Sequence, residues 1–259
     1  MATDLDGTLV HSDGSITERT RVVLAELDRR GIPVVFVTGR PLRWAEAVFD
    51  HVGGHGLAVV SNGALVWNVE QARVETLRAL EPGHALTICG LIRQAIPGSA
   101  FAVETLAGIA LEDEFLERHP VPDGSRRGQL ADLFTEPVIK VLARHEELVA
   151  QDFWDRAESA VGDRAVITWS SDSALLEISA PGVTKASSLA LLCADLGLTA
   201  ADVVAFGDMP NDLPMLAWAG TSYAMANAHP SVLAVADLVA PANDADGVAA
   251  VLTELFDLP

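Results

Sequence analysis

Two aspartates near the start of the chain have the spacing of a reactive pair. Asp4 and Asp6 stand two residues apart, and Gly7 and Thr8 follow them directly. Side chains at positions i and i+2 of an extended segment project to the same side, and a glycine allows a sharp turn after them. Two carboxylates held so close repel each other unless a cation lies between them or one carries a proton. The spacing therefore indicates a divalent-metal and acid–base site, with an ordinary turn at a strand end as the simpler alternative.

A hydroxyl and a cation later in the chain are candidates for binding phosphate. Thr38 and Gly39 follow an apolar run, and a hydroxyl there, with the next backbone amides, can hold a phosphate oxygen. Lys185 closes the stretch GVTK and offers a compact positive charge that can offset carboxylates and phosphate. Taken alone, each has a simpler explanation, a helix cap for Thr38 and a surface lysine for Lys185.

A further group of oxygen-bearing side chains follows another apolar run. Asp208 is followed by Asn211 three residues later and by Asp212 directly after that. Oxygen ligands of this kind suit Mg²⁺, which keeps several waters and takes one or two carboxylates. A polar loop is the simpler explanation of this segment alone. Because all four groups occur in order at the strand ends of one expected sheet, we expect them to form one site.

The elements that must position these residues alternate along the two ends of the chain. Apolar runs between turn signals predict buried parallel strands, and the stretches between them predict helices. The expected strands are a short one before Asp4, then 32–37, 57–60, 64–67, 203–206, 222–225 and 238–239. The expected helices are 18–30, 42–52, 185–196, 215–219 and 247–255. This pattern predicts an α/β fold with a Rossmann-like, doubly wound parallel sheet, in which ligands collect at the carboxyl ends of the strands.

The middle of the chain lacks this alternation. It predicts helices at 84–94 and 151–161, strands at 100–104, 109–111, 138–143, 165–169 and 175–178, and an irregular polar stretch at 113–134. We therefore expect an inserted α+β domain at residues 82–181. The two flanking segments, 1–81 and 182–259, are expected to form one discontinuous core domain.

Composition excludes several classes of partner. Among 259 residues, 17 Lys and Arg stand against 36 Asp and Glu, so the formal net charge is −19. General binding to nucleic acid or to an anionic membrane relies on cationic surfaces, and we expect neither. A phosphorylated substrate would have to be held by a local metal ion and a few placed cations. The two cysteines, Cys89 and Cys193, have no metal-ligand spacing, and no leader or apolar run of about 18 residues is present, so we expect a cytoplasmic protein.

Four motifs together resemble the haloacid dehalogenase superfamily of phosphatases. DLDGTL matches its first motif, VTGR its second, Lys185 its third and GDMPND its fourth. The α+β insert between the second and third motifs resembles the Cof-type branch with a C2 cap, which includes sugar-phosphate phosphatases. The segments SNGALVW, LLEISAPGVTKASSL and PANDADGVA also resemble that branch, so the resemblance covers essentially the whole chain.

The resemblance implies a role for each motif residue. Asp4 would attack phosphorus and form an aspartyl-phosphate. Asp6 would protonate the leaving oxygen and then deprotonate water, and its backbone carbonyl would also be a metal ligand. Thr38 and Lys185 would bind the transferring phosphoryl group, with Gly39 beside them, and Lys185 would also hold Asp4.

The remaining motif residues would hold the metal and the substrate. Asp208 would bind Mg²⁺ directly, with Asp4 and Asp6, and Asp212 would bind it through water. Asn211 and Asp212 would orient metal-bound waters and Lys185, and Asn211 belongs to the expected substrate site. Asn62 and Gly63 lie where this family often contacts substrate.

The expected function is Mg²⁺-dependent hydrolysis of small phosphomonoesters, sugar phosphates or similar metabolites. A phosphotransferase or phosphomutase that acts on sugar phosphates would use the same residues, and a non-catalytic phosphate- or Mg²⁺-binding regulator is a more distant alternative. The insert is expected to choose the leaving group. There, Arg126 and Arg127 either meet a second anionic group of the substrate or belong to a solvated charged face. The sequence does not indicate an oligomeric state.

Overall fold

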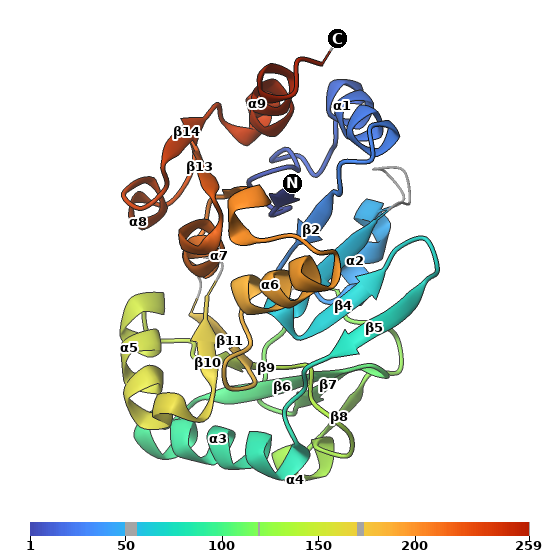
Figure 1. Cartoon of the computed structure of the whole chain (residues 1–259). Coiled ribbons are helices and arrows are strands. Elements are labelled where there is room, and N and C mark those ends of the chain that lie inside the picture. Colours follow the sequence, from blue (N-terminus) through green and yellow to red (C-terminus); the bar gives the residue numbers. More distant parts are fainter. Residues whose placement is uncertain (50–55, 119, 170–173, 259) are drawn as a thin grey trace. The chain divides into compact units, whose positions relative to one another are not determined.

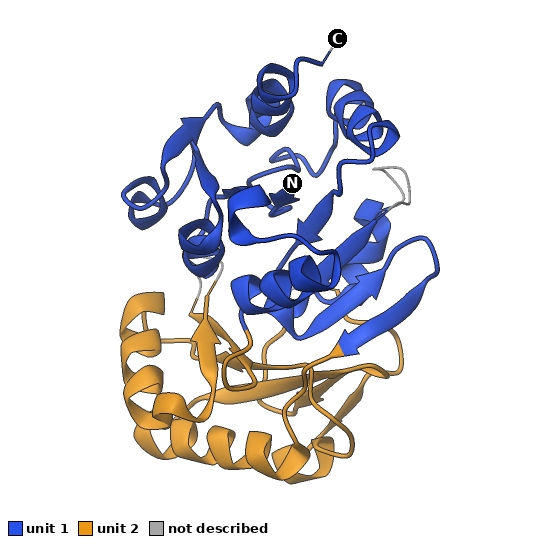
Figure 2. Cartoon of the chain, in the orientation of Figure 1, with its two compact units in different colours: residues 1–76, 184–259 blue, residues 77–183 orange. Residues whose placement is uncertain are grey.

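Both ends of the chain contribute to the same part of the structure. The computed structural model describes residues 1–49, 56–118, 120–169 and 174–258. Residues 1–76 and 184–259 form a first unit, and residues 77–183 form a second (Figure 2). The second unit begins before residue 82 and ends after residue 181, the limits expected from the sequence for the insert.

An eight-stranded sheet forms the centre of the first unit, in the order β14-β13-β12-β1-β2-β3-β4-β5 (Figure 1). Its strands are β1 (Ala2–Thr3), β2 (Val35–Val37), β3 (Leu57–Val60), β4 (Leu65–Asn68), β5 (Arg73–Leu77), β12 (Val204–Gly207), β13 (Thr221–Met225) and β14 (Leu238–Ala240). Neighbours from β14 to β3 pair in parallel, and β4 pairs antiparallel with β3. Because β1 lies between β2 and β12, the segments that follow these three strands meet at one edge of the sheet.

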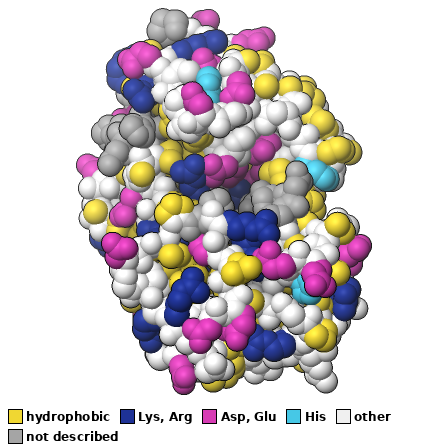
Figure 3. Space-filling model, turned by 180° about the vertical axis from the view of Figure 1, so that it is seen from behind, with side chains coloured by type: hydrophobic (Ala, Val, Ile, Leu, Met, Phe, Trp, Pro, Cys, Tyr) yellow, Lys and Arg dark blue, Asp and Glu magenta, His cyan; other side chains and the backbone are white. Residues whose placement is uncertain are grey.

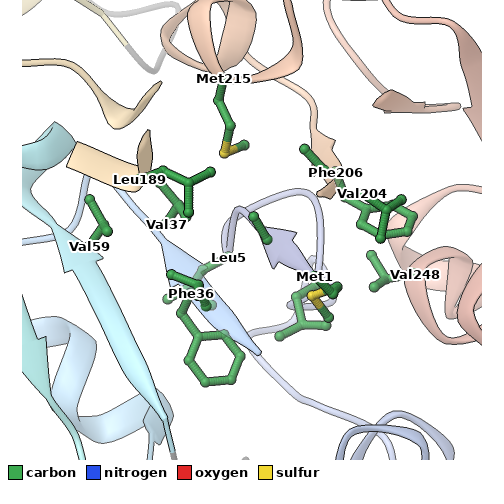
Figure 4. Close-up of a cluster of buried hydrophobic side chains, with 14 of the residues drawn as sticks. Met1, Leu5, Phe36, Val37, Val59, Leu189, Val204, Phe206, Met215 and Val248 are labelled. Atoms are coloured by element: carbon green, nitrogen blue, oxygen red, sulfur yellow. The ribbon is translucent and has the colours of Figure 1, made fainter. Parts of the chain in front are cut away.

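Helices cover both faces of this sheet. They are α1 (Glu18–Arg29), α2 (Leu42–Phe49), α6 (Lys185–Asp195), α7 (Leu213–Trp218), α8 (Pro230–Leu233) and α9 (Gly247–Leu255). Phe36 stacks on Phe49 of α2, with ring centroids 5.8 Å apart. The next residue of β2, Val37, projects to the opposite face, and Leu189 of α6 lies beside it in the buried core (Figure 4). The sheet is therefore doubly wound, as the alternating sequence pattern predicts.

An N-cap residue determines where α1 begins, and the residues after this helix delay the start of β2. The Thr17 side chain accepts a hydrogen bond from the Thr20 amide, as expected for an N-cap. Strand β2 begins at Val35, three residues later than expected. The Ile32 amide still donates to Leu27 O at the helix end, and Pro33 has no N–H to offer a neighbouring strand. Residues 32–34 therefore complete the turn out of α1 before the strand begins.

The second unit contains a six-stranded sheet in the order β10-β11-β9-β6-β7-β8. Its elements are α3 (Pro82–Ala95), β6 (Ala100–Thr105), β7 (Gly108–Glu112), β8 (Arg126–Gly128), α4 (Leu130–Leu133), β9 (Lys140–Arg144), α5 (Ala150–Val161), β10 (Val166–Thr168) and β11 (Leu175–Ser179). The strands pair antiparallel except for β7 and β8, and α3 packs against α5 (Figure 1). The unit is an α+β structure.

Several short elements differ from the sequence-based expectation. Strands β5 and β8 lie at sheet edges, where exposed charged side chains interrupt the apolar pattern that identifies a strand. Helices α4 and α8 have four residues each, too few to show a helical period. The helix expected at 42–52 is described as far as Phe49, and its expected end lies outside the described residues.

The surface and the helices agree with the charge and hydropathy of the sequence. On the face that Figure 3 shows, Lys and Arg side chains are interspersed with Asp and Glu side chains. Within the described part of the chain, each helix is too short or too polar to cross a membrane.

Candidate active site

Polar side chains of four segments meet at the carboxyl edge of the first unit's sheet. Asp4 follows β1, Asp208 follows β12 and Thr38 follows β2, and these strands are direct neighbours. Lys185 is the first residue of α6, which the Thr184 side chain caps. The parallel sheet therefore brings together residues that the sequence separates by up to two hundred positions.

Lys185 joins two of these carboxylates. Its Nζ lies 2.7 Å from Asp4 Oδ1 and 2.7 Å from Asp212 Oδ1, and its side chain is 1% exposed. Burial by itself lowers the pKa of Lys185, but Asp212 and Asp4 outweigh that effect and raise the pKa above its ordinary value. The lysine is therefore a fixed positive charge that orients both carboxylates.

Asp4, Asp208 and Asp212 form a buried acidic group with more negative charge than Lys185 neutralises. One oxygen of each lies within 4.8 Å of the others. Burial raises the pKa of Asp4 well above its ordinary value, and Asp212 and Asp208 raise it further, against the effect of Lys185. Burial and Asp212 likewise raise the pKa of Asp208 to about 6. Three hard oxygen donors beside one lysine are a donor set that fits a divalent cation.

The turn after β12 holds Asp212 in a fixed orientation. Asp212 Oδ2 accepts the backbone amides of Asp208 and Met209, each at 3.0 Å, while its Oδ1 accepts from Lys185. A Cβ at Gly207 would lie 2.6 Å from Asp212 Cβ, so a glycine is needed for this approach. Asp212 is therefore oriented by bonds within the turn and to α6, and Asp208 carries fewer such bonds.

Gly7 and Thr8 bring the first motif against Asp208. Thr8 Oγ1 donates to Asp208 Oδ1 at 2.8 Å. Gly7 has a φ of +72°, and a Cβ there would lie 2.3 Å from Asp208 Oδ2. Any side chain at position 7 would thus be strained and would displace the Asp208 carboxylate.

Asp6 lies apart from the acidic group, although it stands two residues from Asp4. Its side chain is 58% exposed and accepts from Arg40 Nε at 2.7 Å and Arg40 Nη2 at 2.6 Å. The Arg40 amide also donates to Thr38 Oγ1 at 3.0 Å. Because both Asp6 oxygens accept from Arg40, the carboxyl group must turn away before it can give a proton to a leaving oxygen. Arg40 is the last residue of the VTGR motif, and its residue type alone did not indicate a role.

Asn62, Gly63 and Asn211 are also brought to this edge. Asn62 is buried with a left-handed backbone, its amide donates to Thr38 O at 3.0 Å, and its side-chain oxygen accepts from Asn211 Nδ2 at 3.1 Å. Gly63 O accepts from Ser188 Oγ at 2.6 Å. Asn211 Oδ1 is a buried acceptor with no hydrogen-bond partner among the described residues. Such an atom is suited to contact a ligand at this edge.

The other expected residues lie in two different places. Gly39 is half-buried in the turn between Thr38 and Arg40. Arg126 and Arg127 belong to β8 of the second unit, where Arg126 Nη2 donates to Leu133 O at 3.1 Å and Arg127 Nη1 to Phe115 O at 3.4 Å. Both arginines therefore hold neighbouring loops of their own unit, and their contact with a substrate remains a prediction.

Comparisons with known proteins agree with the fold and the motifs. A family model described as haloacid dehalogenase-like hydrolase matches residues 1–252. Phosphoglycolate phosphatase of Methanopyrus kandleri is 28% identical over 255 residues, which cover 98% of this chain and 96% of that protein. The 5-amino-6-(5-phospho-D-ribitylamino)uracil phosphatase YitU of Bacillus subtilis is 28% identical over 276 residues, covering 100% and 97%.

Two further matches are a longer protein and a solved structure. The chloroplastic endoribonuclease YBEY of Arabidopsis thaliana is 29% identical over 272 residues, which are 95% of this chain but 44% of that protein. A haloacid dehalogenase-like hydrolase from Bacteroides thetaiotaomicron superposes with a TM-score of 0.78 at 26% identity, covering 98% of each chain. The similarity to this solved structure extends over both units.

Proposed function

The chain belongs to the haloacid dehalogenase-like hydrolases, and from this premise we propose that it is a Mg²⁺-dependent phosphatase of small phosphomonoesters. Sugar phosphates and similar cytoplasmic metabolites are the proposed substrates. The observation that carries the proposal is the buried group in which Lys185 joins Asp4 and Asp212 beside Asp208. Curated relatives that carry the name phosphatase align over nearly their whole length, which supports the same reaction.

In the first proposed step, Asp4 is the nucleophile. A carboxylate oxygen of Asp4 forms a bond to phosphorus while the bond from phosphorus to the ester oxygen breaks. The electron pair of the broken bond stays on the ester oxygen, which takes a proton from Asp6 and leaves as an alcohol. Lys185 holds Asp4 in place, and the Thr38 hydroxyl, with Gly39 beside it, is proposed to bind phosphoryl oxygens.

In the second proposed step, Asp6 acts as a base. It removes a proton from a water molecule, whose oxygen bonds to phosphorus as the bond between phosphorus and Asp4 breaks. Inorganic phosphate leaves, Asp4 is again a carboxylate, and Asp6 again carries a proton. The exposure of Asp6, in contrast to the burial of Asp4, supports this division of roles, because a group that exchanges protons needs access to water.

The residues present fit a bound Mg²⁺. Asp4 and Asp208 would hold the ion directly, with the backbone carbonyl of Asp6, and Asp212 would hold it through water. When bound, the ion would supply positive charge that stabilises the phosphoryl group as charge develops on its oxygens. The raised pKa values of Asp4 and Asp208 support this assignment, because burial and the neighbouring carboxylates disfavour the charged forms that a bound cation would stabilise.

The second unit is proposed to be the cap that selects the leaving group. It forms one continuous segment inserted between the motifs with Thr38 and with Lys185. Its sheet and loops belong to a separate compact unit, whereas the proposed phosphate-binding edge is built entirely from the first unit. We therefore assign the reaction to the first unit and the choice of substrate to the second.

A substrate screen tests this function directly. Phosphorylated sugars, nucleotides and cofactors are incubated with the protein and Mg²⁺, and release of inorganic phosphate is measured. We expect release from at least one alkyl phosphate, its loss with a chelator, and its loss in the Asp4→Asn variant. Formation of a phosphate isomer without free phosphate would instead indicate phosphotransfer, and no turnover of any substrate would contradict an enzymatic function.

A further inference from the structure

Two asparagines that are distant in sequence from Asp6 are hydrogen-bonded to the turn that carries it. Asn227 Nδ2 donates to Gly7 O at 2.8 Å. Asn227 Oδ1 accepts the backbone amide of Asn243 at 3.0 Å, and Asn243 Nδ2 donates to Val10 O at 3.0 Å. The two side chains thus form one connected chain of hydrogen bonds, which joins the segments after β13 and β14 to the carbonyl of Gly7 in the first motif and to the carbonyl of Val10 directly after it.

The turn is a tight unit in which one carbonyl accepts three amides, while the carbonyls of Gly7 and Val10 accept hydrogen bonds from outside it. The amides of Thr8, Leu9 and Val10 all donate to Leu5 O, at 3.3, 3.0 and 2.8 Å. These bonds close the turn internally, and the Thr8–Asp208 bond and the buried side chains of Leu5, Leu9 and Val10 hold it against the sheet. Gly7 adds further freedom, since a glycine with a φ of +72° has little steric barrier to rotation. The bonds from Asn227 and Asn243 add support at two further points of the turn, at Gly7, the residue directly after Asp6, and at Val10.

Asp4 and Asp6 depend differently on this support. Asp4 is anchored by strand β1, where its amide donates to Phe206 O at 3.0 Å, and by its bond to Lys185. Asp6 lies within the turn, and its side chain is hydrogen-bonded to Arg40. A displacement of the turn would consequently move Asp6 relative to a bound phosphoryl group while Asp4 keeps its place.

The geometry points to Asn227 and Asn243 as positioning residues for proton transfer by Asp6. This inference rests on the proposed function, in which Asp6 gives its proton to the leaving oxygen as Asp4 bonds to phosphorus. Neither asparagine touches the acidic group in the structure, so each acts through the Leu5–Val10 turn. Asp244 and Asp246 extend the same support along the loop, by accepting from Ser12 and from His11.

The dependence of the rate on the leaving group tests this inference. Asn227→Ala is compared with Asn68→Ala, which removes a similar side-chain hydrogen bond, to Glu75, from the β4–β5 hairpin. The value of kcat/KM is measured with 4-nitrophenyl phosphate, whose leaving group needs little protonation, and with the fastest alkyl phosphate of the screen, beginning with glucose 6-phosphate. This constant reports the first step, in which the leaving oxygen takes its proton.

We expect Asn227→Ala to lower kcat/KM for the alkyl phosphate about tenfold to a hundredfold, the effect of a misplacement of about 1 Å. The loss with 4-nitrophenyl phosphate should be no more than about threefold, because general acid catalysis contributes little there. Asn68→Ala should change neither value. Asn227→Asp, which keeps the acceptor for Asn243 but has no donor for Gly7, should show the same selective loss.

Three results would overturn the inference. Equal losses with both substrates would mean that Asn227 does not act on proton transfer, and so would unchanged rates in both Asn227 variants. A loss explained by the melting temperature alone, with normal kcat/KM in the folded fraction, would assign Asn227 a structural role. An inactive wild-type protein is a separate outcome, because it would contradict the proposed function on which the inference rests.

Discussion

Each unit of the molecule buries one lysine against carboxylates, and the two surroundings differ. Lys185 in the first unit and Lys140 in the second are both 1% exposed. Lys140 Nζ lies 2.9 Å from Glu177 Oε1, on the neighbouring strand of the same sheet. Lys185 instead joins Asp4 and Asp212, and Asp208 adds a third carboxylate. One lysine belongs to a cross-strand pair within a sheet, and the other belongs to an acidic group at a sheet edge.

We propose that the difference separates a lysine with a structural role, Lys140, from a lysine with a functional role, Lys185. A buried ion pair contributes little net stability but is costly to break, because the remaining charge stays buried. Ionised carboxylates that are buried close together oppose folding, and the raised pKa values of Asp4 and Asp208 reflect this cost, which comes first from burial and then from the neighbouring carboxylates. Such a cost is expected where the carboxylates attract a ligand. We therefore expect substitutions around Lys185 to affect turnover and those around Lys140 to affect stability.

The largest expected effect comes from neutralising one carboxylate partner of each lysine, Asp4 beside Lys185 and Glu177 beside Lys140. Asp4→Asn replaces the proposed nucleophile by an amide of the same shape and should lower kcat at least about 10⁴-fold. Glu177→Gln is the matched change in the second unit and should leave kcat with 4-nitrophenyl phosphate within about threefold. Phosphate release by the purified, folded variants measures both. More than a tenth of wild-type activity in Asp4→Asn would remove the distinction between the two lysines' surroundings.

Substitution of the two lysines is expected to give the next largest effect. Lys185→Met removes the charge that holds Asp4 and binds the phosphoryl group, so kcat/KM should fall about 10²- to 10³-fold. Lys140→Met should instead lower the free energy of unfolding by about 3 kcal/mol, because it leaves Glu177 buried without this partner. Kinetics with 4-nitrophenyl phosphate and urea unfolding, applied to both variants, test the contrast. Similar kinetic losses in the two variants would contradict it.

Two arginine–carboxylate pairs provide a finer test. Arg40→Ala frees the Asp6 carboxylate, and we expect a fall in kcat/KM of about tenfold, since a catalytic group loses its fixed position. In the second unit, Arg93 Nη2 donates to both oxygens of Glu112, and Arg93→Ala is the matched control. That control should lower the melting temperature and leave kcat/KM with 4-nitrophenyl phosphate within about threefold. A rise in activity in Arg40→Ala would show that this arginine restrains Asp6 rather than placing it.

The smallest expected effect is a dependence of stability on pH in the metal-free protein. Asp208 has a pKa of about 6 in the folded chain against an ordinary 3.8, so between these values the folded state binds more protons than the unfolded state. Its contribution therefore opposes folding increasingly as pH rises through this window, by on the order of 1–3 kcal/mol. Asp4 acts in the same direction, because its pKa is also raised.

The measurement compares wild type with Asp208→Asn, so that titrating groups distant from Asp208 cancel, while Asp4 remains part of the effect. In the presence of a chelator, the stability of wild type relative to the variant should fall between pH 4 and pH 6. Added Mg²⁺ should reverse that fall, because a bound cation favours the ionised carboxylates. A relative stability that rises with pH under chelation would show that these carboxylates are already compensated within the protein.

The sequence predicted the sheet and the motif residues because both depend on local patterns. Apolar runs identified β3 and β12, and the segments after them supplied Asn62 and Asp208. The edge strands β5 and β8 were missed because backbone pairing, rather than burial of alternate side chains, forms them. Long-range polar contacts were missed for a related reason. The bond from Asn227 to Gly7 joins positions 220 residues apart, and neither residue type indicates its partner.

The central claim is that Asp4 forms a covalent bond to phosphorus, and trapping that bond tests it most directly. The protein is mixed with Mg²⁺ and its best substrate, quenched with acid within the first turnover, and digested for peptide mass analysis. We expect the mass of one phosphoryl group on the peptide that contains Asp4, and none on any peptide of the Asp4→Asn variant. Release of phosphate by the wild-type protein with the phosphoryl group on another residue, or on none, would contradict the account.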